Sequence, residues 1–345
     1  MDYIIKRLYK IIYLYTNSKK KLKINKVKLD PNVINTQINN IISSPFFSKK
    51  YIAPLKTVAN DLNLYEITLS DSHVIQINIY TTLSVVVIKK LVNYICFIIF
   101  LNQHYWKKEV SSNLNITIVP LDISKFLPYK YEIIDIEHIN SASTTIYYNN
   151  PGAGDIYIWR KDELSKVLVH ELLHSFNYDQ NLLNITNTGI FKNIDSLNLN
   201  ETFTELSAVL ICIGITSFKK SKNLEQFKTI FIKKIKDENK LSQNNVKKLI
   251  KYNKLDSVSE FTSFKYKQNA SIFSYIILKA AIIFYLLNEN KVLYLKEFPK
   301  PFDNSLELYV SELEKIYKNK KWNTYVDNLQ TPRKSTKLFF TSIKS

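Results

Sequence analysis

Residues 167–180, VLVHELLHSFNYDQ, combine a helical apolar repeat with polar side chains that a buried helix seldom carries. The repeat predicts a helix with one buried face, formed by Val169, Leu172, Leu173 and Phe176. His170 and His174 are four residues apart, and Glu171 follows the first of them. Because residues four apart share one helical face, both imidazoles can point at a single ion. The segment therefore predicts a zinc site or, alternatively, a buried helix whose histidines bond to carbonyl groups.

A third metal ligand is needed, because a catalytic zinc ion takes three protein ligands and keeps one position for water. Glu201 follows the motif along the chain and begins a second predicted helix, in NETFTE. Glu205 lies one turn later on the same face, where it can accept the other ring N–H of a ligating histidine, most simply His170. Cys212 lies about 16 Å further along this helix, too far to bind the same ion. The alternative is that both glutamates are solvated helix residues, although the apolar stripe occupies another face: Phe203, Leu206, Leu210 and Ile213.

Glu171 is the candidate general base. It is offset from His170 by about 100° around the helix, so it can reach a water at the metal rather than the metal itself. Zinc lowers the pKa of such a water to about 7, and a glutamate in this position takes its proton in metalloproteases. The predicted chemistry is hydrolysis of a peptide bond.

The charge of the chain favours no nucleic-acid function. The 345 residues are 46% hydrophobic, enough for one large domain of two lobes or for two domains, and carry 48 Lys and Arg against 30 Asp and Glu. Arginine, which makes the bidentate phosphate and base contacts, occurs only at Arg7, Arg160 and Arg333. A lysine-rich nucleic-acid-binding protein is kept as an alternative, recognisable by salt-dependent binding that survives loss of the histidines.

The two cysteines predict a reducing compartment, and the apolar segments predict buried helices rather than membrane spans. Cys96 and Cys212 lie in apolar runs, which predicts buried free thiols and no disulfide framework. Residues 1–16 have apolar positions at helical spacing, interrupted by basic residues where a signal peptide would be apolar. They predict an amphipathic helix packed on the domain, with an interfacial membrane helix as the alternative. Residues 91–101 are too few to span a bilayer and predict a buried helix.

The order of elements predicts an α+β fold of two lobes with a cleft between them. Residues 1–50 are a basic N-terminal helix and tail, and regular structure is expected from about Tyr51. Residues 51–180 are the first lobe, a mixed sheet with a buried backing helix over 83–106 and the HELLH helix. Residues 181–345 are a mainly helical lobe that supplies the third zinc ligand, with helices over 201–215, 271–287 and 306–322.

Strands and turns of the first lobe follow from β-branched and turn-forming residues. Residues 65–82, YEITLSDSHVIQINIYTT, predict one or two strands, and residues 114–126 predict another. Two strand-like runs flank NNPGAG, residues 149–154, whose Asn, Pro and Gly suit a hairpin connection. Asp162 and Glu163 then occupy the positions of an N-cap and a first-turn acid for the HELLH helix.

His170, Glu171 and His174, followed by Glu201 and Glu205, resemble the gluzincin pattern of thermolysin-like metallopeptidases: HExxH, then a glutamate ligand with an acidic residue four later. The order of strands and helix before the motif resembles the zincin upper lobe. The resemblance covers the two motifs, within 167–205, and, with the preceding lobe, 51–215. It implies Zn²⁺ as the cofactor, a zinc metallopeptidase and a polypeptide substrate. The aminopeptidase signature of Gly, Met, Glu and Asn before the motif is absent, which favours an endopeptidase. The substrate of such an enzyme would pair with an edge strand within residues 143–148, at Thr144, Thr145 and Ile146.

Other zincin classes fit the sequence less well. Metzincins need a histidine six residues after the second one, but that residue is Gln180, and the only methionine is Met1. An aspzincin-like site would need an aspartate, and Asp179 and Asp195 lack a local pattern. The cysteine pattern and the lack of a signal-peptide or membrane-span pattern predict an intracellular, cytoplasmic location. The sequence style is also similar to uncharacterised metallopeptidase-like proteins of large DNA viruses, which implies a place in the virion or the infected cell.

One departure from the gluzincin pattern concerns the group that stabilises the oxyanion. Thermolysin-like enzymes carry a histidine after the third ligand, and this chain has none after His174. Some gluzincins use a tyrosine there, whose phenol can donate a hydrogen bond to developing charge. Tyr275 is the candidate, with Tyr266 as the second choice. The missing histidine also supports an alternative function, a catalytically inactive zinc-binding or structural protein. The remaining histidines are expected to be structural or exposed: His73, His104 and His138.

Overall fold

Two groups of segments, each with its own core, make up the chain in the computed structural model. The first, here the sheet unit, comprises Tyr13–Ser124 and Asn140–Tyr178. The second, the helical unit, comprises Met1–Ile12, Lys125–Ile139 and Asp179–Lys344. The structure describes residues 1–18, 21–70, 74–107, 111–129, 132–147, 149–182, 189–195, 197–263, 266–289, 292, 295–301, 306–330 and 336–343.

A six-stranded mixed sheet forms the sheet unit, in the order β1-β2-β3-β4-β7-β6. Its central pairs, β3 with β4 and β4 with β7, are parallel, and its outer pairs are antiparallel. The predicted α+β class with a mixed sheet is therefore confirmed. The strands are β1 (Lys21–Lys28), β2 (Asn63–Ser70), β3 (Val74–Thr81), β4 (Asn113–Leu121), β6 (Ala142–Thr144) and β7 (Ile156–Arg160).

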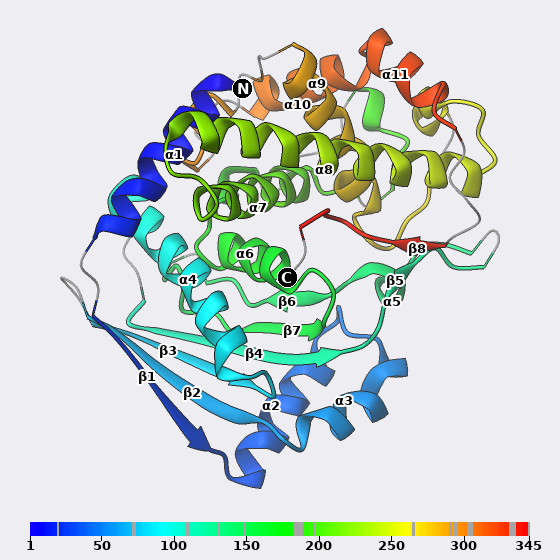
Figure 1. Cartoon of the computed structure of the whole chain (residues 1–345). Helices are drawn as coiled ribbons and strands as arrows, with labels where there is room; N and C mark the ends of the chain where they lie inside the picture. The colour runs from blue at the N-terminus through cyan, green and yellow to red at the C-terminus, as the bar shows by residue number, and fades with distance from the viewer. Residues whose placement is uncertain are drawn as a thin grey trace. The chain divides into compact units, whose positions relative to one another are not determined.

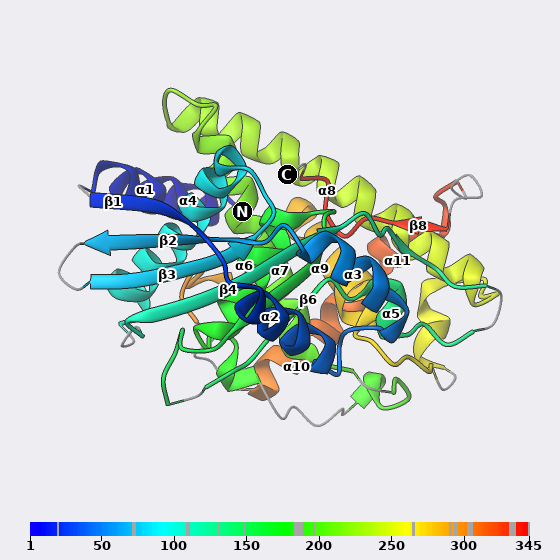
Figure 2. The ribbon, with the colours of Figure 1, turned by 90° about the horizontal axis from the view of Figure 1, so that it is seen from below.

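Helices cover both faces of this sheet. On one face lie α4 (Val85–Leu101), which continues as a π-helical turn over Asn102–Trp106, and α6 (Leu164–Ser175), the HELLH helix (Figure 1). On the other face lie α2 (Pro31–Ser43) and α3 (Ile52–Ala59), which pack against side chains of β4 and β7 and lie in front of the sheet when it is seen from below (Figure 2). The predicted backing helix is confirmed, since α4 is buried along most of its length.

The expectation that regular structure starts near Tyr51 was wrong. Strand β1 pairs with β2 along its whole length, from Lys21 opposite Ser70 to Lys28 opposite Asn63, and α2 follows it. Nearly every side chain of β1 is exposed on both faces. Its sequence, KLKINKVK, alternates only at Leu22 and Ile24, and Val27 is out of step with them. Because neither face is buried, the pattern is short, and backbone pairing with β2 defines this edge strand.

The predicted strands of the first lobe are present with altered bounds. Residues 65–82 form two strands, the antiparallel pair β2 and β3. Residues 114–126 also form two strands rather than one: β4 and the short β5 (Lys125–Phe126), which pairs with β8 (Lys337–Leu338) in the helical unit. The antiparallel pairing predicted on either side of residues 149–154 is present as β6 with β7, but β6 ends at Thr144, the first residue of the predicted run 144–148. His73 lies outside the described residues.

The helical unit is built mainly from helices, as predicted. The expected helix over 306–322 is broken in two, because Asn319 caps a new helix by accepting hydrogen bonds from the backbone N–H groups of Lys321 and Trp322. Its α-helices are α5 (Ile136–Ile139), α7 (Leu199–Phe218), α8 (Leu224–Tyr252), α9 (Lys279–Asn288), α10 (Leu306–Tyr317) and α11 (Lys320–Asp327). Short 3₁₀ segments of this unit occupy Gln180–Leu182, Gly189–Phe191 and Val258–Thr262, and a π-helical segment, Phe273–Leu278, leads into α9. A further 3₁₀ segment, Lys49–Tyr51, precedes α3 in the sheet unit.

The N-terminal helix α1 (Asp2–Asn17) is amphipathic and packs on the protein, as predicted. Its side chains Leu8 and Ile12 lie against α7 at Gly214, where an added Cβ would meet their methyl groups at 3.2 to 3.4 Å. Glycine at this position allows the two helices to approach closely. The buried face of α1 consists of Ile4, Ile5, Leu8, Ile11 and Ile12.

Replacing Leu8 by alanine is expected to destabilise the protein by about 2 to 5 kcal/mol, because Leu8 is fully buried and its removal leaves a cavity. Urea unfolding followed by circular dichroism measures the change. Leu14→Ala, on the same helix but 44% exposed, is the matched control and should leave the unfolding midpoint almost unchanged. Equal midpoints for the two variants would contradict the docking of α1.

Two helical stretches pass the length and composition test for a membrane span: Val85–Trp106 and Leu199–Phe218. The most apolar 18 residues of the first stretch are 67% buried inside the protein, and those of the second are 83% buried. Such burial is typical of core helices, and it agrees with the buried helix predicted over residues 91–101.

Candidate metal centre

Helix α6 carries the HELLH motif, and every one of its residues is buried. The helix begins after Glu163, which has a left-handed backbone conformation and makes no side-chain capping bond. The predicted roles of Asp162 as N-cap and Glu163 as a first-turn acid were therefore wrong, since Glu163 itself is the cap residue. At the other end, the backbone N–H of Gly152 donates to the carbonyl of Ser175 at 2.7 Å, so the turn before β7 contacts the end of α6.

The two histidines of α6 turn their ring nitrogens toward each other. The Nε2 atoms of His170 and His174 are 3.0 Å apart, and the rings are nearly perpendicular, with centroids 4.7 Å apart. Two nitrogen ligands of one tetrahedral zinc ion, each about 2.1 Å from it, lie about 3.4 Å apart. The observed spacing is close to this value, so the pair matches two ligands of one ion.

Glu201 lies in the first turn of α7 and is half-buried. One ligand atom from each of His170, His174 and Glu201 lies within 4.8 Å of the other two. Two imidazole nitrogens and one carboxylate oxygen are the donor set of many catalytic zinc sites. The three residues selected from the sequence could therefore hold a metal ion.

The phenol of Tyr275 donates a hydrogen bond of 3.1 Å to Oε2 of Glu201. Tyr275 belongs to the π-helical segment Phe273–Leu278, a local widening of the helix that is frequent at functional sites. Tyr266 is fully buried between the rings of Phe261 and Phe273. Burial raises the pKa of Tyr266 above its ordinary value. Of the two candidate tyrosines, Tyr275 is the one beside a predicted ligand, and Tyr266 is a core side chain.

Glu171, the predicted base, has a hydrogen-bond partner that the sequence did not indicate. Its Oε2 atom accepts a 2.6 Å hydrogen bond from the hydroxyl of Thr144. Thr144 ends β6, which lies at the edge of the sheet beside β7. The sequence predicts only a backbone contact with substrate for Thr144, so this side-chain contact is a new feature of the site.

The predicted substrate strand starts earlier than expected. Of its three candidates, Thr144 lies in β6, whereas Thr145 and Ile146 follow its end. Thr145 continues the pairing by one bond, from its N–H to the carbonyl of Asp155 at 3.0 Å. Gly154 permits this, because a Cβ there would lie 1.7 Å from the carbonyl oxygen of Thr145. Tyr148, at the end of the predicted strand, lies outside the described residues.

Glu205 contacts a buried lysine. Its Oε1 atom lies 3.4 Å from Nζ of Lys279, and the same ammonium lies 3.3 Å from Oε1 of Glu238. Lys279 also donates to the carbonyl of Phe340. The hydrogen bond from His170 to Glu205 stays a prediction. A lysine within the apolar run SIFSYIILKAAIIFYLL was the available signal for a buried acidic partner, and the sequence reasoning missed it.

The alternative aspartates do not join the metal group. Asp179 is buried and accepts a 3.0 Å hydrogen bond from the side chain of Asn200, the residue before Glu201. The backbone N–H of Asp195 donates to the carbonyl of Tyr266. In the part of the chain that the structure describes, neither aspartate belongs to a set of three donors close enough for one ion.

His104 and His138 have the structural or exposed character that was predicted. His104 is exposed and lies against the ring of Phe100, with centroids 4.4 Å apart. His138 is buried, and its Nδ1 accepts a 2.9 Å hydrogen bond from the backbone N–H of Asp135. Cys96 and Cys212 are both buried, as predicted.

Comparisons with known proteins add no constraint to this site. No family model, no curated protein and no solved structure matches the chain. The function is therefore inferred from the residues of the site and their geometry alone.

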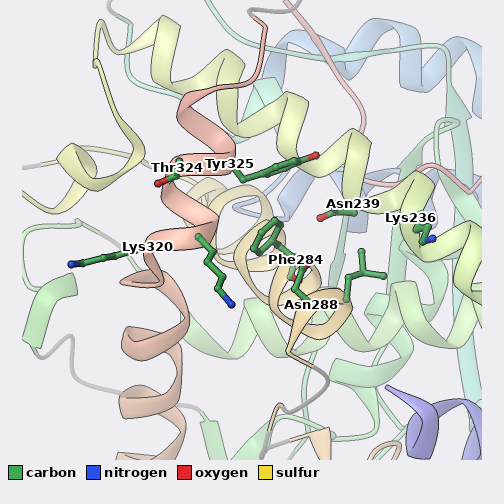
Figure 3. A pocket seen from close by; sticks show the side chains of 9 residues that line it. Lys236, Asn239, Phe284, Asn288, Lys320, Thr324 and Tyr325 are labelled. Carbon is green, nitrogen blue, oxygen red and sulfur yellow. The ribbon is translucent and has the colours of Figure 1, made fainter.

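A separate pocket of about 850 Å³ lies in the helical unit, among α8, α9 and α11 (Figure 3). Its aromatic wall is the pair Phe284 and Tyr325, whose ring centroids are 5.0 Å apart. One of its lysines, Lys321, is paired with Glu289 at 3.2 Å. None of the predicted site residues lines this pocket, which is formed by Lys236, Asn239, Phe284, Leu287, Asn288, Lys320, Lys321, Thr324 and Tyr325.

Proposed function

We propose that this protein is a zinc-dependent metallopeptidase of the gluzincin type, with His170, His174 and Glu201 as the metal ligands. The single observation that carries the proposal is the approach of one ligand atom from each of these residues to within 4.8 Å of the others. Glu201 was chosen from sequence because it follows HExxH at the gluzincin position. A chance pair of histidines on a helix gives no reason for a carboxylate from a different helix to lie beside them.

The donor set suits zinc better than calcium or magnesium, which prefer oxygen ligands. Both histidines are buried, and imidazole is a common zinc ligand. When bound, zinc supplies Lewis-acid polarisation of the scissile carbonyl and a water of lowered pKa.

Glu171 is the general base in this proposal. Its carboxylate takes the proton of the attacking water and passes it to the leaving amine, so that its own charge is restored at the end of each turnover. Tyr275 is the candidate donor to the negative charge that develops on the carbonyl oxygen. Its support is its position beside the third ligand: its single proton bonds to Glu201 in this structure and would have to turn to the carbonyl oxygen during the reaction.

The substrate class is an extended polypeptide. Strand β6 is short, lies at the sheet edge and is followed by Thr145, so it offers backbone groups to which an extended chain can add. Recognition of this kind uses main-chain hydrogen bonds, which do not depend on substrate sequence. It suits an endopeptidase.

Zinc content tests the proposed ligands. The wild type should contain about one zinc ion per chain by elemental analysis, and His174→Ala and Glu201→Ala should lose it or bind it far more weakly, because two protein ligands seldom hold zinc. The matched controls are His104→Ala, an exposed histidine, and Glu225→Ala, an exposed glutamate in the first turn of α8. Both controls should keep the metal.

Two results would contradict the proposal at different levels. A folded wild type that stays free of zinc after zinc is supplied would leave HELLH as a buried helix with two histidines. A zinc-loaded wild type that cleaves no member of a peptide library would instead favour the inactive zinc-binding protein.

A further inference from the structure

The hydrogen bond between Thr144 and Glu171 joins the edge strand of the sheet to the active helix. The hydroxyl of Thr144 lies 2.6 Å from Oε2 of Glu171 and 3.4 Å from the backbone carbonyl oxygen of the same residue. A hydroxyl has one proton to donate, and the shorter distance is that of a charge-assisted O–H···O⁻ bond. The carboxylate is therefore the acceptor.

Both partners are held by the framework of the sheet unit. Thr144 pairs with Ile156 of β7, and the next backbone N–H, that of Thr145, bonds to Asp155. Its β-branched side chain has few χ1 rotamers, so a fixed backbone gives a fixed hydroxyl. Glu171 lies in the middle of the buried helix α6, which contacts both β6 and β7.

Only one of the two carboxylate oxygens is occupied by this bond. Among the described residues, no hydrogen bond reaches Oε1 of Glu171, whereas Oε2 accepts from Thr144. A carboxylate anchored through one oxygen cannot rotate freely, and its second oxygen stays available to accept a proton.

We propose that Thr144 is a positioning residue for Glu171, which holds the carboxylate through Oε2 so that Oε1 faces the reacting water. This inference rests on the proposed peptidase function. It also gives the edge strand a second role, because the residue at the end of β6 orients the base through its side chain while the strand backbone binds substrate.

The test is Thr144→Val, which keeps the shape of the side chain and removes the donor. We expect kcat to fall by about 10- to 100-fold, since a misplacement of about 1 Å has effects of this size. KM should stay within about twofold, because the hydroxyl makes no contact that substrate binding requires. Thr144→Ser, which retains the donor, should restore most of kcat. Thr68→Val is the matched control, a half-buried threonine in β2 of the same sheet.

A second measurement is independent of catalysis and of metal. In crystal structures of the metal-free proteins, Oε2 of Glu171 should lie within hydrogen-bond distance of residue 144 in the wild type and in Thr144→Ser. In Thr144→Val the carboxylate should be displaced or should occupy several rotamers. A carboxylate that keeps its place in Thr144→Val overturns the proposal.

The kinetic outcomes also separate the two proposals. An unchanged kcat in Thr144→Val, or a raised KM with unchanged kcat, overturns the positioning role. If the zinc-loaded wild type hydrolyses no peptide, the proposed function fails, and the carboxylate position in the metal-free variants still decides whether Thr144 orients Glu171.

Discussion

Glu171→Gln is expected to lower kcat for peptide hydrolysis by about 10²- to 10⁴-fold while the zinc content stays unchanged. General base catalysis contributes about this much, and an amide cannot accept the proton of the attacking water. The substitution preserves shape, and the amide oxygen can still accept the hydrogen bond from Thr144. The variant therefore removes the base without removing its anchor.

The measurement combines steady-state kinetics on a cleaved peptide with elemental analysis of the same preparation. Glu66→Gln, a half-buried glutamate of β2, is the control for a lost carboxylate in the same unit. Full activity in Glu171→Gln would remove Glu171 from the mechanism. Loss of zinc in this variant would instead assign Glu171 to the metal site rather than to proton transfer.

The second large effect is expected for Lys279→Met, which should lower the free energy of unfolding by about 3 to 5 kcal/mol. Lys279 is 2% exposed and lies between Glu205 and Glu238, which are 1% and 0% exposed. Removing one member of a buried ion cluster leaves the opposite charges without compensation. The resulting loss of unfolding free energy exceeds the net stabilisation that the intact pairs provide. Methionine fills a similar volume, so the effect should come from charge rather than from a cavity.

Urea unfolding of the metal-free protein measures this effect without interference from zinc binding. Lys228→Met is the matched control, because Lys228 pairs with Asp2 at 2.9 Å, closer than either contact of Lys279, but on the surface. It should leave the unfolding midpoint almost unchanged, since exposed pairs contribute little. Similar midpoints for the two variants would show that the buried ion pairs of Lys279 contribute no more to stability than the exposed pair of Lys228. Adding Glu238→Gln to Lys279→Met should recover part of the lost stability.

The buried cluster also connects the C-terminal segment to α7. The hydroxyl of Thr341 and the backbone N–H of Ser342 donate to Oε2 of Glu238 at 2.9 and 2.6 Å, and Phe340 lies against Tyr275, with ring centroids 5.6 Å apart. Residues around position 340 therefore help to order side chains close to Glu201. Nothing in the local sequence of this segment predicts such contacts.

Features that depend on neighbouring residues could be read from the sequence. The spacing of Val169, Leu172 and Leu173 predicted α6, and the turn residues at 149–154 predicted the pairing of β6 with β7. Both depend on backbone geometry within a few residues, so the signal is present in the local pattern. The predicted N-cap of α6 was wrong because Glu163 adopts a left-handed backbone conformation that no residue propensity indicated.

Features that depend on distant residues escaped the same reasoning. Strand β1 has no buried face, so its pairing with β2 left only a short alternation, at Leu22 and Ile24, in its sequence. The hydroxyl of Thr144 and the ammonium of Lys279 gained their roles from residues 27 and 74 positions away. Neither of these sequence separations corresponds to a repeat that a helix or strand pattern would reveal.

The sequence by itself determined that His170 and His174 share a face of one helix, with Glu171 beside them, because the 3.6-residue period fixes those directions. Only the tertiary structure decided that Glu201 lies within reach of both histidines, that Tyr275 bonds to it and that Thr144 anchors Glu171. A helix specifies its own faces through local hydrogen bonds, whereas contacts between elements depend on how whole surfaces pack, and many arrangements are compatible with one local pattern.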